Sequence, residues 1–497
     1  MKAESTEATD VVVVGGGPGG STAAALVAKQ GHRVVLLERE AFPRYQIGES
    51  LLPVTVHGVC NLLGVRDRIE QAGFMRKNGG TFKWGKSSEL WTFAFKTNRY
   101  LKSYSAGYSY QVERSRFDAI LLENARNKGA DVRVGCSATG LLRDGERVVG
   151  VTYQDPSGAT HELRARYVVG AAGNADHLYR HVGERVLSRF FQNVALFCYF
   201  QGDKRLPPPN DGNILCVAFD KGWFWHIPLR PDLASVGAVI AKEHAAQIGE
   251  DKEAAMRAFI DSCPEMRDRL AGARRVTEGI YGRFRVRADY SYCNTRFWRP
   301  GLVLVGDAAC FIDPVFSSGV HLATYAGLLA ARSINTVLEG QLGEEACFQE
   351  FEHRYRREYG VFYDFLLGFY DMHQDTGSYF WNARKVLQSE EQSNEAFVRL
   401  VAGAGTTSSE FFSMRDGIGE RFESYKNERM AGVTPPHDPT AKKVDVPRIL
   451  VGMSTEEGQI WDQAKLGGER GPEKAVFERG LAPSPDGLRW VQAAAGG

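Results

Sequence analysis

The chain opens on an apolar run, a glycine cluster and a small-residue stretch that together constrain its fold. Val11–Val14 is wholly β-branched, which is typical of a parallel strand buried on both faces. Gly15–Gly20 follows, then an alanine-rich stretch to about Gln30 and a second apolar run at Arg33–Leu37. This order predicts a strand, a helix and a second parallel strand, the βαβ unit that opens a Rossmann-type sheet.

The glycine cluster contains G-x-G-x-x-G and predicts that a dinucleotide binds here. Gly15 permits the tight turn, Gly17 lets the backbone approach a pyrophosphate, and Gly20 lets the helix pack against the strand. Pro18 belongs to the same loop and is assigned to the same site. The helix N-terminus that follows offers free N–H groups to the phosphates. Glu38, just past the second apolar run, is placed to accept hydrogen bonds from ribose hydroxyls.

Length and composition narrow the class of protein. A chain of 497 residues suffices for two or three domains, and its formal net charge of +1 gives no reason to expect a nucleic-acid partner. The 8 cysteines are scattered without C-x-x-C spacing, so we expect neither a metal site nor a disulfide framework. The N-terminus is polar, and no run reaches the ~18 apolar residues of a spanning helix. We therefore expect a cytoplasmic protein without a membrane partner.

A second glycine-rich stretch, VGDAACFIDPVFSSGVHLA, begins at Val305. The apolar run Leu302–Val305 predicts another buried parallel strand, and a helix is expected to begin near Ser318. Asp307 could then accept hydrogen bonds from the ribityl hydroxyls of a flavin, while the backbone of Ser318–Val320 faces the flavin ring. Here the sequence resembles the FAD-dependent monooxygenase superfamily, over roughly Val11–Ala330.

Within that superfamily, four motifs resemble the flavin-dependent halogenases. FIDPVFSSG contains F-x-x-P-x-x-S-x-G, which distinguishes halogenases from hydroxylases, and WFWHIP matches their W-x-W-x-I-P. The segments Phe42–Pro53 and Arg76–Gly85 look like those of members that act on phenol or pyrrole rings. Taken together the four motifs are specific, although one alone would not be.

The resemblance implies a set of site residues, carried over position by position. The catalytic residue is Lys77; the halide-binding residues are Ser318 and Gly319; the substrate-pocket residues are Trp223, Trp225 and Phe316; and the cofactor-binding residues are Gly15, Gly17, Pro18, Gly20, Glu38, Arg114, Asp307, Pro314, Gly319 and Val320.

The implied chemistry uses reduced FAD, O2 and chloride to make hypochlorous acid, with the chloride held by the N–H groups at a helix start. Lys77 would direct the oxidant to one ring carbon, provided that burial lowers its pKa. Without the motifs, Lys77 reads as a solvated loop charge. Trp223 and Trp225 point to one face of a strand, where core packing is the usual explanation, and Arg114 fits a helix-capping role nearly as well as cofactor binding.

Two departures from related families refine the hypothesis. Tryptophan halogenases carry a glutamate where this chain has Phe316, so tryptophan is not the expected substrate. Flavin hydroxylases carry an Asp-Gly pair where this chain has Gly170–Gly173, which suggests that a separate flavin reductase supplies the reduced FAD. His226 and His321 are expected to be structural rather than catalytic.

The expected fold is α/β: a Rossmann-type FAD-binding domain of the flavin monooxygenase fold, a β-sheet substrate domain and a helical C-terminal region. The FAD-binding module spans 1–330 with a β-rich substrate segment inserted at about 190–287, followed by a helical region, 331–430, and a tail, 431–497. The stretch from Phe42 to about Tyr110 reads as irregular, with one helix near Val54–Gly73. The aromatic segment YGVFYDFLLGFYDMH is expected either to cover the substrate entrance or to form packed helical core.

The resemblance implies a halogenase of secondary metabolism, such as antibiotic biosynthesis, that chlorinates an electron-rich aromatic ring, and a phenol is the expected substrate. By resemblance the substrate is tethered to an acyl or peptidyl carrier protein. A single-component flavin hydroxylase or a prenyl reductase on the same fold is the rival enzyme, and a non-catalytic flavoprotein is the rival from another class. Neither rival class needs Lys77 or the halide loop.

Overall fold

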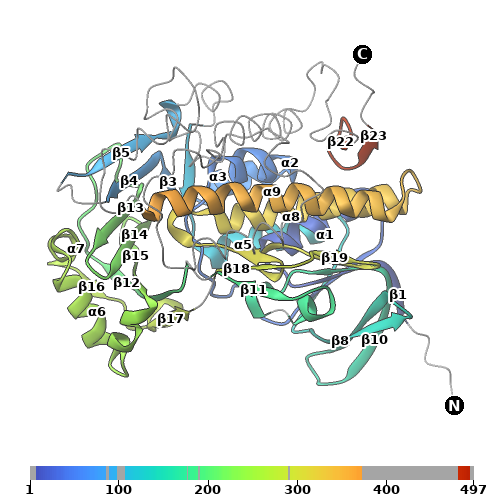
Figure 1. Cartoon of the computed structure of the whole chain (residues 1–497), viewed down its shortest axis with the longest axis horizontal. Helices are drawn as coiled ribbons and strands as arrows, with labels where there is room; N and C mark the ends of the chain where they lie inside the picture. The colour runs from blue at the N-terminus through green and yellow to red at the C-terminus, as the bar shows by residue number, and fades with distance from the viewer. Residues whose placement is uncertain are drawn as a thin grey trace, which may run out of the picture.

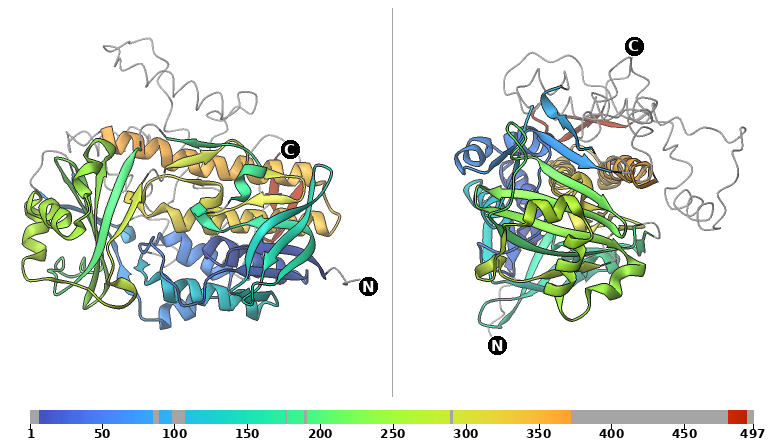
Figure 2. Two further views of the ribbon diagram at one scale, coloured as in Figure 1. Left: turned by 90° about the horizontal axis from the view of Figure 1, so that it is seen from below. Right: turned by 90° about the vertical axis from the view of Figure 1, so that its left-hand side faces the viewer.

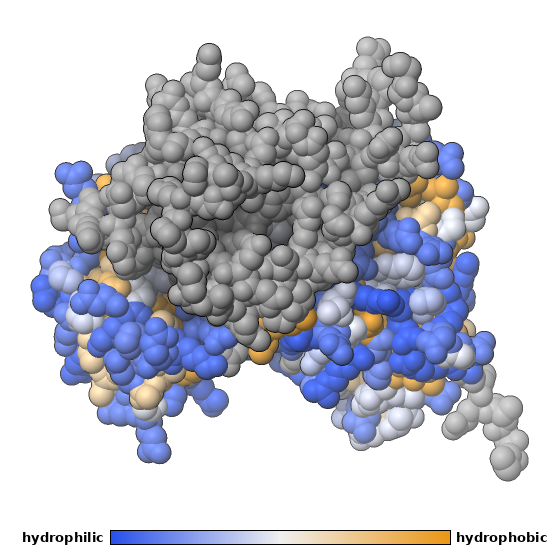
Figure 3. All heavy atoms as spheres, in the orientation of Figure 1, coloured by the Kyte–Doolittle hydropathy of each residue, from blue (hydrophilic) through white to orange (hydrophobic). Residues whose placement is uncertain are grey.

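The computed structural model describes residues 7–84, 89–97, 107–175, 177–188, 191–288, 291–371 and 480–492. Two large sheets lie at opposite ends of the molecule, and the long helices α8 (Ser318–Leu338) and α9 (Glu344–Asp371) run across it between them (Figure 1). Where described, the surface facing the viewer is mostly hydrophilic, with apolar residues in small scattered groups (Figure 3).

The first sheet is the predicted Rossmann sheet. Its order is β19-β20-β10-β1-β2-β7, and the five strands from β20 to β7 run parallel. Two further strands, β8 and β9, extend antiparallel from β10. The strands are β1 (Glu7–Val14), β2 (Val34–Glu38), β7 (Asp131–Val134), β8 (Ser137–Asp144), β9 (Arg147–Gln154), β10 (Thr160–Gly170), β19 (Trp298–Arg299) and β20 (Leu302–Leu304). This arrangement confirms the predicted fold class.

Helix α1 (Pro18–Ala28) follows β1 and is buried along its whole length. Its small side chains, such as Ala23 and Ala24, let it pack closely between the parallel sheet and α8. Figures 1 and 2 show this arrangement from different sides. Gly31, with a φ of 85°, takes the left-handed conformation beyond its end, which glycine adopts without strain. The predicted strand, helix and strand are therefore confirmed.

The second sheet forms the β-rich substrate segment. Its order is β16-β12-β15-β14-β13-β4-β5, with β17 paired to β12. Helices α6 and α7, which the sequence did not predict, cover its outer face. The elements are β4 (Gly79–Lys83), β5 (Trp91–Ala94), β12 (Asn193–Gln201), β13 (Ile214–Phe219), β14 (Gly222–Arg230), β15 (Leu233–Ala241), β16 (Arg274–Arg275), β17 (Arg285–Ala288), α6 (Lys252–Asp261) and α7 (Pro264–Leu270).

The stretch between Phe42 and Tyr110 is more ordered than the sequence suggested. β4 pairs parallel with β13 and antiparallel with β5, so this stretch supplies two strands of the substrate sheet. The single helix expected near Val54–Gly73 was wrong. The chain instead forms a π-helical turn at Val54–Val59, then α2 (Cys60–Leu62) and α3 (Arg66–Gln71), because Gly64 breaks the run with a φ of 75°.

Three small sheets, one more α-helix and several short 3₁₀ helices complete the described fold. The predicted helix after Val112 is α5, and the small sheets pair β3 with β6, β11 with β18 and β21, and β22 with β23. No helix of the described ranges is both long and apolar enough to cross a membrane. These elements are α5 (Arg114–Asn127), β3 (Met75–Lys77), β6 (Ser109–Gln111), β11 (Arg185–Leu187), β18 (Tyr292–Asn294), β21 (Cys310–Phe311), β22 (Leu481–Pro483) and β23 (Trp490–Gln492).

The last described stretch, 480–492, packs on α8 and α9. Trp490 is fully buried, its indole Nε1 donates to Ser333 Oγ at 2.8 Å, and its backbone N–H donates to Thr336 Oγ1 at 2.8 Å. The guanidinium groups of Arg332 and Arg354 lie 4.6 and 4.8 Å from its ring centroids. This hairpin therefore fastens a remote part of the chain to the helices behind the halide loop.

Replacing Trp490 by alanine is expected to destabilise the protein. The change removes a fully buried aromatic side chain and leaves the Ser333 hydroxyl without its donor, which should lower the free energy of unfolding by about 3–5 kcal/mol. Denaturant unfolding followed by fluorescence measures the loss. Val491→Ala is the matched control, because Val491 is the next residue and is 37% exposed. Equal midpoints for the two variants would contradict this account.

Candidate active site

One large cavity, with a volume of about 1160 Å³, lies between the Rossmann sheet and the substrate sheet. Its volume exceeds the roughly 300–1,000 Å³ usual for pockets that hold drug-sized ligands. Residues of both sheets form its wall. The predicted site residues that line it are Gly15, Gly17, Pro18, Glu38, Arg114, Trp223, Trp225, Asp307, Pro314, Gly319 and Val320.

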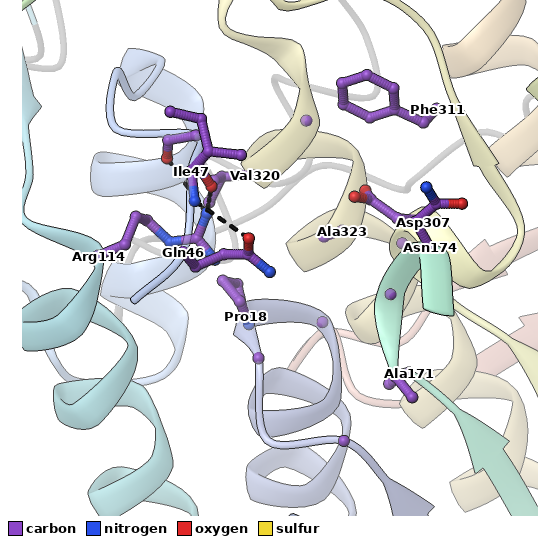
Figure 4. Close-up of a pocket in the computed structure, with 18 of the residues that line it drawn as sticks. Pro18, Gln46, Ile47, Arg114, Ala171, Asn174, Asp307, Phe311, Val320 and Ala323 are labelled. Atoms are coloured by element: carbon purple, nitrogen blue, oxygen red, sulfur yellow. Dashed lines mark hydrogen bonds between the residues drawn. The ribbon is translucent and has the colours of Figure 1, made fainter. Parts of the chain in front are cut away.

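The glycine loop has the close approaches that its motif predicted. A Cβ on Gly15 would lie 2.5 Å from the Ala171 carbonyl oxygen, and one on Gly20 would lie 1.9 Å from the Gly15 carbonyl oxygen. A Cβ on Gly17 would meet only Arg44, at 3.5 Å, so the space beside it is open. The loop therefore leaves room for a pyrophosphate at the start of α1, where Pro18 faces the cavity (Figure 4).

Glu38 ends β2 at the edge of the same cavity. Its Oε2 accepts a hydrogen bond from the Gly16 backbone N–H at 2.6 Å, and its Oε1 accepts one from the Glu40 N–H at 2.8 Å. These bonds fix the carboxylate while each oxygen keeps a free lone pair. The position fits the ribose contact expected of the acidic residue in this fingerprint.

The second glycine-rich stretch closes the opposite side of the cavity. Asp307 follows β20, and burial raises the pKa of its carboxyl to about 6, against the opposing charges of Arg114, Arg287 and Arg185. Asp307 and Phe311 face Pro18 across the cavity in Figure 4. A dinucleotide cradle at one end and a carboxylate at the other fit an FAD molecule laid along the cavity. When bound, FAD would supply the electrons for reducing O2.

Arg114, the first residue of α5, is buried at the cavity wall. Its guanidinium forms two hydrogen bonds with Asp118, at 2.7 and 2.9 Å. The same group donates to the carbonyl oxygens of Ile47 and Gly48, the latter at 3.3 Å. Its side chain therefore ties the loop at Ile47–Gly48 to α5, in addition to any contact it makes with the cofactor.

The predicted halide loop ends in a helix start, as expected. Ser317 adopts the left-handed conformation, with φ 61°, and α8 begins at Ser318. The N–H groups of Ser318 and Gly319 belong to the first turn, which has no intrahelical acceptors. Gly319 lines the cavity, and a Cβ there would lie 3.2 Å from the Phe311 ring. The first turn of α8 therefore offers hydrogen-bond donors to a small anion at the cavity wall, beside the Phe311 ring.

Lys77 lies at the end of β3 with a side chain only 2% exposed. Its Nζ donates to Ser50 Oγ at 2.8 Å and to the Leu51 carbonyl oxygen at 3.1 Å, and it lies 3.5 Å from Ser317 Oγ. Burial lowers the pKa of the amine to about 7. Lys77 itself does not line the cavity, but Ser50 and Ser317 do, so the amine sits directly behind the wall. The solvated-loop alternative for Lys77 is excluded.

Of the three predicted substrate-pocket residues, the two tryptophans line the cavity and Phe316 does not. Trp223 and Trp225 both line the cavity, with ring centroids 6.1 Å apart, whereas Phe224 between them packs into the outer core of the substrate sheet. Phe316 does not line the cavity. It is 1% exposed and packs against Phe82, at 6.2 Å between ring centroids. Phe316 therefore anchors the predicted halide loop to β4 from the side away from the cavity.

The two histidines lie outside the cavity wall. His226 is buried on the outer face of β14, where its Nε2 lies 2.8 Å from Asp203 Oδ2. His321 is buried in α8, where its Nε2 lies 2.6 Å from Glu358 Oε1. Both rings are held by carboxylates within the packed core, which supports the structural roles expected for them.

The sequence reasoning assigned no role to Glu49 or Ser50, although both lie in the quoted segment Phe42–Pro53. Both side chains are buried and both residues line the cavity. The available signal was a polar pair between Gly48 and the apolar Leu51, but a single sequence does not show that such a pair is buried. Gly20 and Ser318, which were assigned, support the loops without lining the cavity.

Comparison with known proteins agrees with this geometry. The sequence profile described as tryptophan halogenase matches residues 10–106 and 96–419. A tryptophan 2-halogenase of Chondromyces crocatus is 35% identical over 407 residues, which cover 80% of this chain and 76% of that protein. The flavin-dependent halogenase gsfI of Penicillium aethiopicum is 32% identical over 382 residues, covering 71% and 69%.

Solved structures give the same result. The myxobacterial chondrochloren halogenase CndH, described as a new variant of FAD-dependent halogenases, is 51% identical, with a TM-score of 0.75 over 98% of this chain and 100% of that one. The flavin-dependent brominase Bmp2 is 27% identical, with a TM-score of 0.71 over 86% and 99%. The chain therefore belongs to the tryptophan halogenase family and is an FAD-dependent halogenase.

Proposed function

We propose that the enzyme chlorinates a phenolic ring with hypochlorous acid made from reduced FAD, O2 and chloride, and that Lys77 directs the oxidant. One observation carries this proposal: the buried Lys77 amine contacts Ser50 and Ser317, two hydroxyl side chains of the cavity wall, at 2.8 and 3.5 Å. An oxidant released at the halide loop would meet this amine on leaving the cavity.

The protonation state of Lys77 suits this task. A pKa of about 7 leaves much of the amine neutral at neutral pH, whereas an exposed lysine would be almost wholly charged. A neutral amine can hydrogen-bond hypochlorous acid or become chlorinated itself. Among the described residues no ion pair joins Lys77 to a carboxylate, and burial outweighs the opposing effect of Cys216 on the pKa of the amine.

We assign chloride to the start of α8. The N–H groups of Ser318 and Gly319 lie where the helix dipole favours an anion, and Gly319 keeps the approach from the cavity open. The left-handed Ser317 immediately precedes these N–H groups, and its hydroxyl lies 3.5 Å from the Lys77 amine. Halide and lysine are thus held by consecutive residues of one loop.

The substrate is inferred from what surrounds Phe316. This ring packs against Phe82, which in turn stacks on Phe93, so the position where tryptophan halogenases carry a glutamate is apolar here. An electron-rich phenol needs less help, because its own oxygen supplies electron density to the ring. We therefore favour a phenol over tryptophan.

Tryptophan is the second candidate substrate, because the relative from Chondromyces crocatus is named a tryptophan 2-halogenase. The single-component hydroxylase, the prenyl reductase and the non-catalytic flavoprotein are not supported, since the family is one of halogenases. The proposal further includes a cytoplasmic location and a role in secondary metabolism.

We also propose that the aromatic substrate arrives tethered to a carrier protein and that a separate reductase supplies reduced FAD. Of the segment YGVFYDFLLGFYDMH, Met372 and His373 lie outside the described residues. Its side chains Tyr359, Phe362, Tyr363 and Leu366 are buried, which favours packed core over an exposed docking patch for that part of α9. The carrier proposal therefore rests on resemblance in the motifs.

Lys77→Met is expected to separate oxidant formation from oxidant use. FAD binding and the oxidation of reduced FAD by O2 should be unchanged, because the cofactor lies against Gly15–Gly20, Glu38 and Asp307. Chlorinated product should fall about 10³-fold, in line with the loss of a general-acid or covalent group. Stopped-flow flavin absorbance and product mass spectrometry measure the two steps.

Lys83→Met is the control for this variant, because Lys83 lies six residues later on β4 and is half-buried outside the cavity wall. It should shift the free energy of unfolding by under ~0.5 kcal/mol and leave turnover normal. Near-normal chlorination by Lys77→Met would remove the central residue of the proposal.

A competition between substrates tests the phenol assignment. Given reduced FAD, O2 and chloride, the enzyme should chlorinate a phenolic acid loaded on a carrier protein best, the free acid less well and free tryptophan hardly at all. Mass spectrometry counts each product. Equal use of tryptophan would overturn the phenol assignment, and equal use of the free and loaded acids would overturn the carrier assignment alone.

Reduction of the flavin is expected to need a second protein. Mixed with FAD and NADH or NADPH, the purified enzyme should leave the absorbance of oxidised flavin unchanged on the timescale of turnover. Adding a flavin reductase should bleach it and start chlorination. Rapid bleaching by the enzyme alone would show that it reduces its own flavin.

A further inference from the structure

A buried carboxyl group, that of Glu49, lies in the cavity wall and has no role in the chemistry described so far. Its side chain is 2% exposed. The next residue, Ser50, holds the Lys77 amine at 2.8 Å. Both residues line the cavity, so one short segment presents an acid to the cofactor cavity and a hydroxyl to the catalytic lysine.

Glu49 is connected to a chain of tyrosine hydroxyls. Its Oε1 accepts a hydrogen bond from Tyr199 OH at 2.7 Å, and Tyr199 OH lies 2.8 Å from Tyr45 OH. Tyr45 is half-buried and also lines the cavity. The chain therefore runs from a buried acid to a side chain that the solvent in the cavity can reach.

The other carboxyl oxygen, Oε2, has no hydrogen-bond partner among the described residues. The Ser235 hydroxyl lies near the carboxyl and accepts a hydrogen bond from Trp225 Nε1 at 3.2 Å. A buried ionised oxygen without a partner is costly, whereas a protonated one can donate. Oε2 is thus the natural place for a proton.

Burial and the surrounding groups bring the pKa of this carboxyl close to neutral pH. Burial raises the pKa of the Glu49 carboxyl to about 7, and the nearby carboxylate of Glu113 acts in the same direction. The hydroxyl groups of Tyr199 and Ser235 and the charge of Arg114 act in the opposite direction. These are the groups that face Glu49 from β12, β15 and the start of α5.

The reaction itself requires a proton. If the proposed function holds, reduced FAD, O2, a halide ion and one proton give oxidised FAD, hypohalous acid and one water. The O–O bond breaks, one oxygen binds the halogen, and the other leaves as water. O2 takes up four electrons, two from reduced FAD and two from the halide. Lys77 does not line the cavity, whereas Glu49 does, so Glu49 is the acid that is placed to supply this proton.

We propose that Glu49 donates the proton that converts the departing oxygen atom into water, and that Tyr199 and Tyr45 return a proton to it between turnovers. This inference rests on the proposed function. Glu49 lies in the cavity wall and Lys77 lies behind it. The proton that forms the oxidant would then come from Glu49, while the neutral amine of Lys77 would act only when the oxidant is used.

The two steps should therefore differ in pH dependence. Oxidant formation needs protonated Glu49 and should slow as the pH rises through about 7. Chlorination of the ring also needs neutral Lys77 and should slow as the pH falls through about 7. The complete reaction should show a bell-shaped profile, whereas oxidant formation alone should show only the alkaline limb.

Glu49→Gln tests the proposal, because glutamine keeps the shape and the hydrogen bond from Tyr199 but donates no acidic proton. With reduced FAD, O2, chloride and catalase, hypochlorous acid is trapped as the sulfoxide of N-acetylmethionine, against a control without chloride. The variant should bind oxidised FAD with unchanged affinity, form oxidant about 10²-fold more slowly, and lose the alkaline limb. Tyr199→Phe should keep the first turnover near normal and slow the later ones.

Infrared spectroscopy gives a readout that does not depend on activity. The protein, with and without FAD, should show a carboxylic acid band that disappears as the pH rises through about 7 and that Glu49→Gln lacks. Glu113→Gln is the control, since Glu113 is buried nearby but does not line the cavity, and it should keep the band. If Glu49→Gln fails to fold, Glu49→Asp replaces it and should retain both the band and the alkaline limb.

Two results would overturn the inference alone: native-like oxidant formation and pH profile in Glu49→Gln, or the absence of a Glu49 acid band below neutral pH. Failure of the native enzyme to form any hypochlorous acid would overturn the proposed function, and the inference with it. The native protein and the variant therefore distinguish the two failures.

Discussion

The site depends on a close crossing of two helices, α1 and α8. A Cβ on Gly327 of α8 would lie 2.5 Å from the Gly19 carbonyl oxygen of α1, and one on Gly19 would lie 2.9 Å from the Ala323 carbonyl oxygen. Only glycine allows this approach. The approach lies at the start of α1 and further along α8, and residues at the starts of both helices, Pro18 and Gly319, line the same cavity. One helix start can then receive phosphates and the other a halide.

Around this crossing, burial changes the acid–base chemistry of the side chains. The same cause weakens the ordinary charged forms of both groups, since desolvation lowers the pKa of Lys77 and raises that of Glu49, each to about 7. Both groups are therefore poised to exchange protons at neutral pH. A solvent-exposed pair would instead be locked as an ammonium and a carboxylate.

Local patterns in the sequence were enough to predict much of this arrangement. The glycine loop, the end of β2 at Glu38 and the helix start at Ser318 follow from short motifs whose geometry is set by nearby residues. The alternation of Trp223 and Trp225 correctly indicated one face of a strand. The fold class followed from these elements, because parallel strands with a glycine fingerprint leave few alternatives.

What could not be predicted depends on distant partners. β4 is a strand because it pairs with β13, more than a hundred residues away, and its own sequence, GGTFK, contains two glycines. The hairpin that buries Trp490 is stabilised by α8 and α9 rather than by its own length. Glu49 carries no local signal either, since a glutamate in a loop is usually solvated.

Arg114 shows both a local sequence motif and contacts with residues that are distant in the chain. Its motif suggested cofactor binding or a helix cap, but its hydrogen bonds run to Asp118 and to the carbonyl oxygens of Ile47 and Gly48. Those carbonyls immediately precede Glu49 and Ser50, so the guanidinium fixes the segment that presents the acid to the cavity and the hydroxyl to Lys77. Gly48, with a φ of 97°, makes the turn, and a Cβ there would lie 2.9 Å from the Arg114 Nη1. The arginine thus positions both proton-exchanging groups, through one loop, from the helix that packs against the flavin-binding sheet.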